Sequence, residues 1–390
     1  MMKGFSYFAP LRIIFETGAI NKIGQVCARN GRRVLLVVGK NHLFRNGVID
    51  VILDAFKRTE KIEEVEVFNE TPQNPDSESV EKAKQLILSK QLDLVVAVGG
   101  GSAMDLAKAA SICAKNNINF IDVYKHPRLP LLDAYPVVCS PTTSGSGSEV
   151  TKYAVINENS LKIKVAIGSE ALFPRVSLID PQLTYTMPKE VIANTGFDAL
   201  SHAIEAFSSK SSSPITDAYC REAISIIGVH LPQAFNKNKE SMDNMSLAAM
   251  FAGMALNVGR ASLPHALEHA LSAYNPSLPH GLGLSMVMPG FLKRAYRCNL
   301  EKFAQVAYLL GEDISNKKLD DAAKLCVDAV EKLKSKIGLN KNLKDFGFDK
   351  KTVDEMVENT LWTMEHGIKN SPCQFSVNEI KNIYYEALED

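Results

Sequence analysis

The sequence lacks several features that would place the protein in a specialised class. No apolar run approaches the roughly 18 residues that cross a bilayer, which argues against a transmembrane segment. No block of five like charges occurs, and 44 basic residues balance 44 acidic ones, so neither nucleic acid nor a membrane is indicated as a partner. Fixed-period repeats and low-complexity segments are also missing. We therefore expect an ordinary globular protein.

Cysteine is scarce and has no pattern. The seven cysteines are odd in number and none falls in a CxxC spacing, which argues against a disulfide framework and is typical of free thiols in a reducing compartment. The first fifteen residues are mixed in character and do not resemble a signal peptide. The sequence thus predicts a cytoplasmic protein whose cysteines are all free.

The first half of the chain alternates short apolar runs with amphipathic stretches. With 390 residues, of which 46% are hydrophobic and 23% charged, the chain can form two domains with proper cores. Such an alternation predicts a parallel sheet covered on both faces by helices. The expected strands are Leu11–Phe15, Val34–Val38, Val65–Phe68, Leu92–Val98, Pro136–Cys139, Tyr153–Ile156, Ile163–Ile167 and Val176–Ile179. The expected helices between the early strands are Gly47–Arg58, Asp76–Ser89 and Ser102–Lys115.

The β-rich composition ends after Asp180-Pro181, and the remaining sequence has the character of helices. The fold class is therefore α/β followed by all-α, with an N-terminal domain over residues 1–182 and a helical domain over residues 183–390. Because active sites commonly lie in clefts between domains, we expect the site to face the open strand ends of the first domain.

Acidic and imidazole side chains gather in the helical half. Asp198 and His202 are four residues apart within an apolar stripe of helical period, so they share one helix face. His265 and His269 repeat this spacing, and His280 follows a proline. A carboxylate with several imidazoles is a mixed ligand set suited to iron, zinc or a similar divalent ion.

The alternative is that these histidines are ordinary core residues, since polar pairs at this spacing also stabilise helices. Burying four such groups without a cation would be costly, which favours a metal site in the helical domain.

Two loops of the first half are rich in hydrogen-bond donors. Gly99-Gly100-Gly101-Ser102 joins an apolar strand to an expected helix that carries Asp105. Glycines there allow backbone N–H groups to approach a phosphate at a helix N-terminus, although tight turns also favour glycine. The second loop, Pro141 to Glu149, carries five hydroxyl groups; it could be a flexible linker, but strands flank it on both sides. The pair predicts a phosphate-bearing ligand such as a dinucleotide.

With these motifs the chain resembles the iron-containing (group III) alcohol dehydrogenases over nearly its whole length, and Leu267-Glu268 before His269 matches the butanol dehydrogenase-like members. The resemblance implies a dinucleotide-binding α/β domain and a helical metal-binding domain. It implies that Asp198, His202, His265 and His280 bind the metal, Fe²⁺ or alternatively Zn²⁺, and that His269 lies beside the nicotinamide as a catalytic residue. The cofactor contacts that it implies are Gly39, Asn41, Asn74, Gly99, Gly100, Gly101, Ser102, Asp105, Thr142, Thr143, Ser144, Ser146, Lys164 and Leu183.

The choice of cofactor depends on the end of the strand Val34–Val38. Many NAD-using members of the family carry an aspartate where this chain has Gly39, and such a carboxylate binds the ribose hydroxyls and repels a 2′-phosphate. Gly39 leaves room for that phosphate, and Lys40 or Asn41 could donate to it, although Lys40 could also simply point to solvent. We therefore expect NADP(H) to be favoured over NAD(H).

The resemblance implies an enzyme that transfers hydride between a nicotinamide cofactor and a short primary alcohol or its aldehyde. It also suggests a homodimer joined through strands such as Leu11–Phe15. Three alternatives are a zinc polyol dehydrogenase of the glycerol type, a lyase of the dehydroquinate synthase type, and a non-catalytic metal or nucleotide binder. The lyase would need a basic phosphate-binding cluster, for which Lys293, Arg294 and Arg297 are the candidates.

Overall fold

The structure is a computed structural model that describes residues 4–125 and 133–389. Its contacts divide the chain into two compact units. The N-terminal unit comprises Ala9–Thr143 and Ser148–Thr186, and the helical unit comprises Met187–Asp390 together with the chain up to Phe8 and the loop Ser144–Gly147. A domain boundary at residue 182 stays a prediction, as does the expected position of the site at the strand ends of the first domain.

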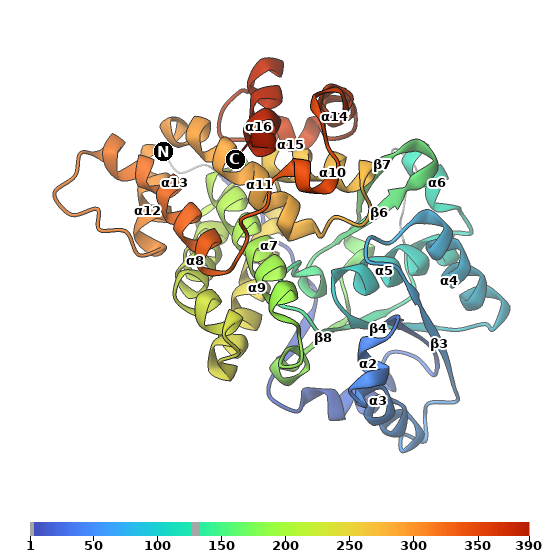
Figure 1. Ribbon diagram of the computed structural model, residues 1–390. Coiled ribbons are helices and arrows are strands. Elements are labelled where there is room, and N and C mark those ends of the chain that lie inside the picture. Colours follow the sequence, from blue (N-terminus) through green and yellow to red (C-terminus); the bar gives the residue numbers. More distant parts are fainter. Residues whose placement is uncertain (1–3, 126–132, 390) are drawn as a thin grey trace. The chain divides into compact units, whose positions relative to one another are not determined.

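The N-terminal unit contains a six-stranded sheet in the order β1-β8-β5-β4-β2-β3, with every neighbouring pair parallel (Figure 1). Its strands are β1 (Arg12–Phe15), β2 (Arg33–Gly39), β3 (Glu64–Thr71), β4 (Leu94–Gly99), β5 (Val137–Pro141) and β8 (Val176–Ile179). Its helices are α1 (Ile23–Cys27), α2 (His42–Arg45), α3 (Val48–Lys57), α4 (Ser77–Ser89), α5 (Gly101–Asn116) and α6 (Phe120–Lys125). The predicted parallel sheet is confirmed.

Both faces of this sheet are buried because successive residues of a strand point to opposite sides. In β2, Leu35 and Val37 belong to an apolar cluster with α4 and α5, whereas Val34, Leu36 and Val38 belong to a second cluster with α1 and α3. This explains why the strand is apolar throughout instead of alternating.

Two of the expected strands form a separate sheet. β6 (Tyr153–Glu158) and β7 (Ile163–Gly168) pair only with each other among the described strands, in an antiparallel hairpin. The hairpin packs against α5. The sequence located both strands but gave no sign that they leave the parallel sheet.

The helical unit is built from ten helices of the described chain, with no strand among them. They are α7 (Lys189–Ser208), α8 (Pro214–Phe235), α9 (Lys239–Gly259), α10 (Leu263–Tyr274), α11 (His280–Ala295), α12 (Leu300–Leu309), α13 (Leu319–Lys336), α14 (Lys350–Thr363), α15 (Glu365–Asn370) and α16 (Val377–Glu389). The helices α7, α8 and α9 pack on one another, and α11 contacts both α7 and α10.

One disulfide corrects the expectation of free cysteines. Cys298 and Cys373 are bonded, with their Cα atoms 5.8 Å apart, whereas the other five cysteines are free and buried. The two residues are 75 positions apart in the sequence. Packing of α11 against α16 brings their chain segments together, and no spacing rule could have revealed that.

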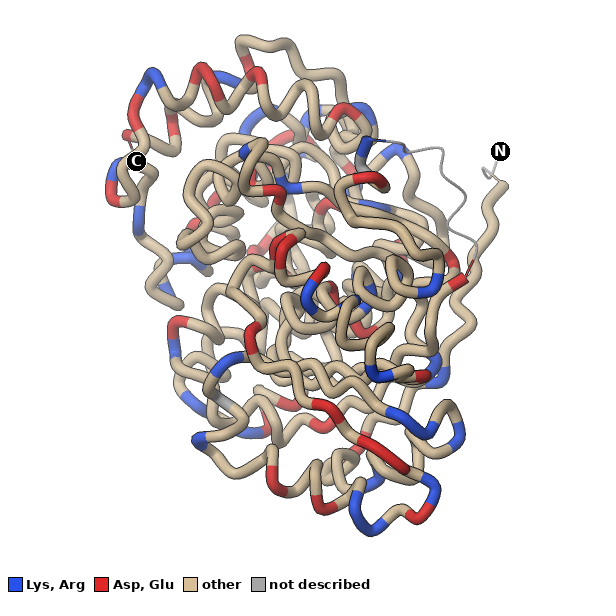
Figure 2. Tube along the Cα trace, turned by 90° about the vertical axis from the view of Figure 1, so that its right-hand side faces the viewer, with Lys and Arg blue, Asp and Glu red and all other residues tan. Residues whose placement is uncertain are grey.

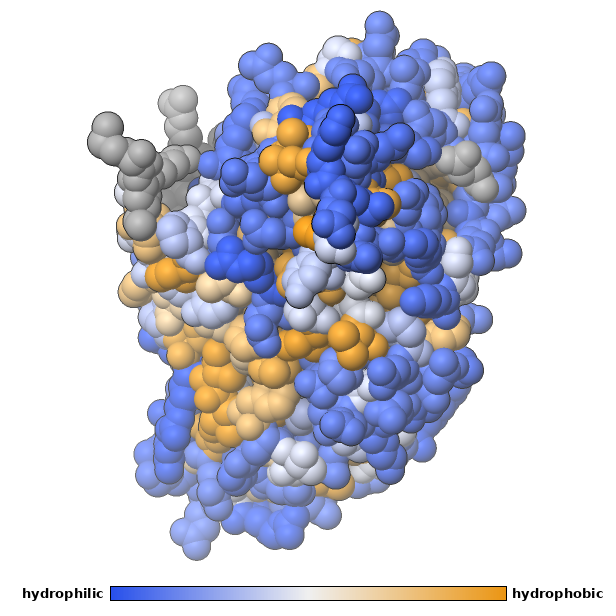
Figure 3. Space-filling view, turned by 90° about the vertical axis from the view of Figure 1, so that its left-hand side faces the viewer, coloured by the Kyte–Doolittle hydropathy of each residue, from blue (hydrophilic) through white to orange (hydrophobic). Residues whose placement is uncertain are grey.

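The surface is mixed in character. Basic and acidic positions are interspersed along the chain (Figure 2). Seen from the side of α8, α12 and α13, hydrophobic patches interrupt a largely hydrophilic surface (Figure 3). Within the described residues, every helix is too short or too polar to cross a membrane.

Candidate functional site

Helix α7 supplies the first two residues of the site. Asp198 and His202 are one turn apart on its buried face, with Asp198 Oδ1 3.6 Å from His202 Nε2. Both side chains are nearly inaccessible to solvent. The helical stripe seen in the sequence therefore predicted this pair correctly.

The helices α10 and α11 bring two more imidazoles to the same carboxylate. His265 Nε2 and His280 Nε2 each lie 3.6 Å from Asp198 Oδ1. His280 reaches this position because α11 begins directly against α7. A Cβ atom on Gly281 would lie only 1.8 Å from the carbonyl oxygen of Asn194, so this approach requires glycine.

The cluster has the geometry of a cation site. Ligand atoms of Asp198, His202 and His265 lie within 4.8 Å of one another. A tetrahedral shell with bonds of about 2.0–2.2 Å separates its ligand atoms by roughly 3.3–3.6 Å, close to the distances around Asp198. Two buried atoms that face this centre, Asp198 Oδ1 and His265 Nε2, have no hydrogen-bond partner in the described part of the chain. The residues present therefore fit a divalent metal ion.

The charges within the cluster perturb one another. Burial alone would raise the pKa of Asp198, but His202, His280 and His265 hold it below its ordinary value. Burial lowers the pKa of His202 to about 4. For His265 burial acts in the same direction, yet Glu205 and Asp198 raise its pKa to about 10. Burial and the neighbouring carboxylates thus act in opposite directions on the pKa of each of these two imidazoles.

Two glutamates to which the sequence analysis assigned no role at the site contact this cluster. Glu205 Oε1 lies 2.5 Å from His265 Nδ1, and Glu268 Oε2 is paired with His280 Nδ1. Neither glutamate is accessible to solvent. A signal existed: each is a charged residue within an otherwise apolar helical stretch, where burial requires a partner.

His269 lies beside the cluster but outside the three buried ligand candidates. Its ring centre is 6.2 Å from that of His280, and it is buried. This arrangement agrees with a role next to the metal centre.

In the N-terminal unit, several of the predicted glycines lie at the carboxyl ends of two central strands. Gly39 ends β2, Gly99 ends the neighbouring β4, and the backbone N–H of Thr142 donates to the carbonyl of Gly99 at 2.9 Å. The chain leaves β2 toward β3 on one side and leaves β4 toward β5 on the other. Open parallel sheets bind nucleotides where the connections diverge in this way.

Gly100 caps the start of α5. No side chain caps this helix end, so its first backbone N–H groups can bind an anion. A Cβ on Gly100 would come within 3.2 Å of Thr143 Oγ1. The structure therefore brings Gly99–Ser102 and Thr142–Thr143 together as the sequence analysis expected.

The other predicted cofactor residues have varied surroundings. Lys164 Nζ donates to Asn74 Oδ1 at 3.3 Å, so these two are neighbours. Asp105 accepts from Ser148 Oγ and from the backbone N–H of Val155, and its contact with a cofactor stays a prediction.

The surroundings of five further predicted cofactor residues also differ from one another. Leu183 belongs to the apolar cluster around β2 and β4. Ser144 and Ser146 belong to the helical unit, where Ser144 Oγ lies 3.0 Å from Ser246 Oγ. Asn41 is exposed, and Gly101 begins α5. Contact of any of the predicted residues with a cofactor stays a prediction.

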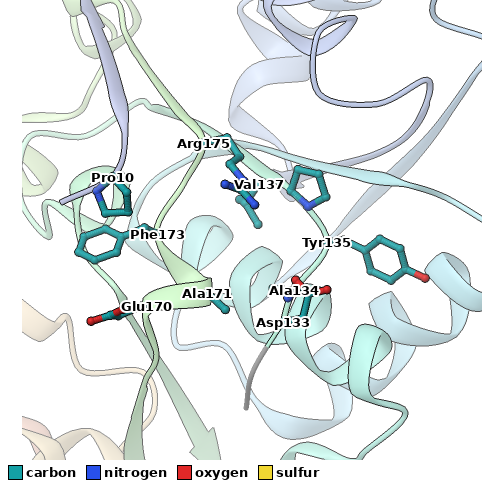
Figure 4. A pocket seen from close by; sticks show the side chains of 10 residues that line it. Pro10, Asp133, Ala134, Tyr135, Val137, Glu170, Ala171, Phe173 and Arg175 are labelled. Atoms are coloured by element: carbon teal, nitrogen blue, oxygen red, sulfur yellow. Dashed lines mark hydrogen bonds between the residues drawn. The ribbon is translucent and has the colours of Figure 1, made fainter. Parts of the chain in front are cut away.

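The N-terminal unit also has a pocket of about 140 Å³ (Figure 4). Pro10, Asp133, Tyr135, Glu170, Phe173 and Arg175 are among the residues that line it. It contains none of the predicted cofactor residues and lies at the amino ends of β5 and β8.

The uncapped, glycine-rich start of α5 in one unit and the buried Asp/His cluster in the other are the features expected of a metal-dependent dehydrogenase that uses a dinucleotide. Two family models match, "Iron-containing alcohol dehydrogenase" over residues 10–181 and "Fe-containing alcohol dehydrogenase family, C-terminal" over residues 192–388. The chain belongs to the iron-containing alcohol dehydrogenase family.

Three relatives illustrate the family. The 1,3-propanediol dehydrogenase of Klebsiella pneumoniae is 32% identical over 389 residues, covering 98% of each chain. The NADPH-dependent butanol dehydrogenase of Clostridium saccharobutylicum is 30% identical, covering 96% of each chain. Among solved structures, the NADH-dependent butanol dehydrogenase A of Thermotoga maritima has a TM-score of 0.90 at 27% identity, covering 99% of each chain.

Proposed function

We propose that this enzyme catalyses reversible hydride transfer between NADP(H) and a short primary alcohol or its aldehyde. Asp198, His202, His265 and His280 would hold Fe²⁺, with Zn²⁺ as the alternative. The observation that carries the proposal is that three imidazole nitrogens each lie 3.6 Å from one buried carboxylate oxygen.

These residues would hold a divalent ion, which would supply Lewis-acid chemistry for polarising a carbonyl and stabilising an alkoxide. The protein's own residues prepare the centre. The pKa of Asp198 is held below its ordinary value and that of His202 is lowered to about 4, so both offer lone pairs at neutral pH. His269, next to His280, would carry the proton between the substrate oxygen and solvent.

The surroundings of Gly39 support the preference for NADPH. No atom lies within 4 Å of the position that a Cβ on Gly39 would occupy, so the end of β2 has space for a 2′-phosphate. Lys40 and Asn41 are exposed beside it and can donate hydrogen bonds. The butanol dehydrogenase relative that uses NADPH agrees with this choice, whereas the Thermotoga enzyme uses NADH.

The substitution Gly39→Asp tests the cofactor preference. The same open space lets the new carboxylate enter without a clash, so a loss of activity reports charge and not misfolding. We expect the ratio of kcat/KM for NADPH over NADH to fall by tenfold or more, equal to about 1.4 kcal/mol. The ratio is measured with short aldehydes, on protein whose iron and zinc contents are determined. A wild-type ratio that strongly favours NADH contradicts the proposal.

A diol or polyol substrate is the second candidate, and the propanediol dehydrogenase relative favours it. Its discriminating measurement is activity on a diol panel against the matching monoalcohols. The lyase alternative is weakened by the structure. Lys293 and Arg294 share the one carboxylate of Glu386, and Arg297 pairs with Asp320, so two of the three positive charges already face a carboxylate.

The edge of the sheet suggests how two copies would associate. In the described chain β1 pairs only with β8 and ends the sheet on that side, which leaves one row of its backbone groups available to a second β1. We propose a homodimer through this edge and a cytoplasmic location, and sedimentation analysis of the purified enzyme tests the dimer.

A further inference from the structure

Two buried glutamates contact imidazoles of the proposed metal cluster on the side away from Asp198. Glu205 and Glu268 are fully inaccessible to solvent, and each meets the Nδ1 atom of one histidine, His265 and His280 respectively. The Nε2 atoms of the same two rings face Asp198. Each ring is therefore held between a carboxylate on one side and the proposed metal position on the other.

This arrangement determines which nitrogen is available to a cation. A carboxylate only accepts hydrogen bonds, so Nδ1 of each ring must carry the proton. When that ring is neutral, its Nε2 atom has a lone pair. A carboxylate behind a metal-binding histidine also fixes the ring orientation and increases its basicity.

His202 is held differently. Its Nδ1 atom is buried and has no hydrogen-bond partner among the described residues. Its ring stacks on that of His265, with centres 4.4 Å apart and planes 15° from parallel. The orientation of His202 therefore depends on His265, and through that ring on Glu205.

Glu205 also contacts the start of α10. Its Oε2 atom accepts from the backbone N–H of Ser262 at 2.7 Å and from Ser262 Oγ at 3.1 Å, and it lies 3.4 Å from the backbone N–H of His265. Ser262 is the N-cap of α10 and its side chain does not cap the helix. Glu205 thus supplies the acceptor at the positive end of that helix.

The partners of Glu268 are more adaptable. Its carboxylate meets His280 and accepts from the hydroxyl of Ser272. A hydroxyl can reverse its role and accept from an amide, so glutamine can satisfy both Ser272 and His280. At position 205 a glutamine NH₂ group would face N–H donors on one side or the other.

We propose that Glu205 and Glu268 are positioning residues that set the metal affinity of the cluster. Position 205 requires a carboxylate, whereas position 268 requires only an acceptor aimed at His280. This inference rests on the proposed function, because it takes Asp198 and the histidines as the metal ligands.

The test measures Co²⁺ affinity of the metal-free full-length protein by competition with a chelator, and the visible spectrum of the bound ion. We expect Glu205→Gln, Glu205→Ala and Glu268→Ala to bind Co²⁺ about 10–100-fold more weakly. Glu268→Gln should stay within about threefold of wild type, since glutamine can keep the hydrogen bonds to His280 and Ser272. Asp217→Asn is the matched control. It removes a carboxylate that pairs with Lys302 in the same unit, and its Co²⁺ affinity should be unchanged.

Ser262→Ala separates positioning from helix stability. It removes one donor to Glu205 Oε2 but leaves the contact of Oε1 with His265, so it should lower the thermal midpoint without changing Co²⁺ affinity. If it weakens Co²⁺ binding as much as Glu205→Gln does, Glu205 acts only through the fold and the inference is overturned.

Gly283→Ala moves the Glu268 carboxylate without changing its chemistry, because the new Cβ would come within 3.1 Å of Glu268 Cγ. We expect several-fold weaker Co²⁺ binding. If the Glu205 variants do not fold, Gly283→Ala, Glu268→Gln and Glu268→Ala still test whether a buried glutamate sets the Co²⁺ affinity. Equal Co²⁺ affinity of wild type and all glutamate variants overturns the inference alone, whereas a wild type that takes up no Co²⁺ overturns the metal site itself.

Discussion

Each unit of the protein buries a cluster of charged side chains, and the two clusters differ in how they are satisfied. In the N-terminal unit, Lys108 Nζ donates to Ser148 Oγ at 2.8 Å and to the carbonyls of Thr151 and Tyr153 at 2.9 and 3.0 Å. Asp105 accepts from Ser148 Oγ and from a backbone N–H. In the helical unit, by contrast, Asp198 Oδ1 and His265 Nε2 have no such partner within the described chain.

The difference shows how to distinguish a structural cluster from a binding site. Burial lowers the pKa of Lys108 and raises that of Asp105, yet their hydrogen bonds all end on protein atoms. Such a network holds the loop after β5 to helix α5. The cluster around Asp198 has unsatisfied atoms that point to one centre, which is the signature of a ligand supplied from outside the chain.

Removing a proposed ligand should have the largest effect. We expect His265→Ala to lose its bound metal on dialysis and to lose turnover, because it deletes both a ligand and the ring on which His202 stacks. The measurement is metal content per chain together with kcat.

The matched variant is His269→Ala, which should keep the metal and lose about 10²–10⁴-fold in rate as a missing proton carrier does. A His265→Ala protein with one tightly held metal per chain and normal activity would show that the ligand assignment is wrong.

Removing a charge from the hydrogen-bonded cluster of Lys108 and Asp105 should lower the free energy of unfolding. Lys108→Met leaves buried carbonyl groups unpaired and Asp105 without its counter-ion, so we expect the N-terminal unit to lose about 3–5 kcal/mol of unfolding free energy. Urea unfolding followed by circular dichroism measures this, and metal content serves as the control. A loss below about 1 kcal/mol with reduced metal content would reverse the roles of the two clusters.

The pH dependence of stability should sharpen the comparison. Burial raises the pKa of Glu149, which is next to this cluster, from 4.5 to about 7. Folding therefore takes up a proton between these values, so stability falls as the pH rises from about 4.5 to about 7, by on the order of 3 kcal/mol. Glu149→Gln should remove this slope and be more stable than wild type at pH 8. Parallel curves of urea midpoint against pH for the two proteins would contradict the expectation.

Periodicity in the sequence predicted the elements well, and its limits are visible in particular residues. Val34–Val38 could be identified as a buried strand because an unbroken apolar run indicates cover on both faces. The pairing of Asp198 with His202 followed from helical spacing alone. The family resemblance, and not spacing, assigned His265 and His280 to the same centre.

The features that sequence patterns missed are all contacts between different helices or strands. The order of the strands places Gly39 beside Gly99, and no local pattern encodes that order. The approach of His280 depends on Gly281 lying against Asn194. The contacts of Glu205 with α10 cross 57 or more positions of sequence. Such contacts depend on which helix faces pack together, and this is decided by the whole core.

The division of the chain has a consequence for its synthesis. The residues up to Phe8 and the loop Ser144–Gly147 belong with helices made much later. The hydroxyl of Tyr7 donates to the carbonyl of Met254, 247 positions away, and Gly147, at a φ of 61°, passes close to Gly253. At about 5–20 residues per second, a ribosome needs roughly 10–50 s to bridge the first of these separations. The sheet can close once β8 has emerged, whereas the segment that carries Tyr7 must wait for α9 before it can reach its final place.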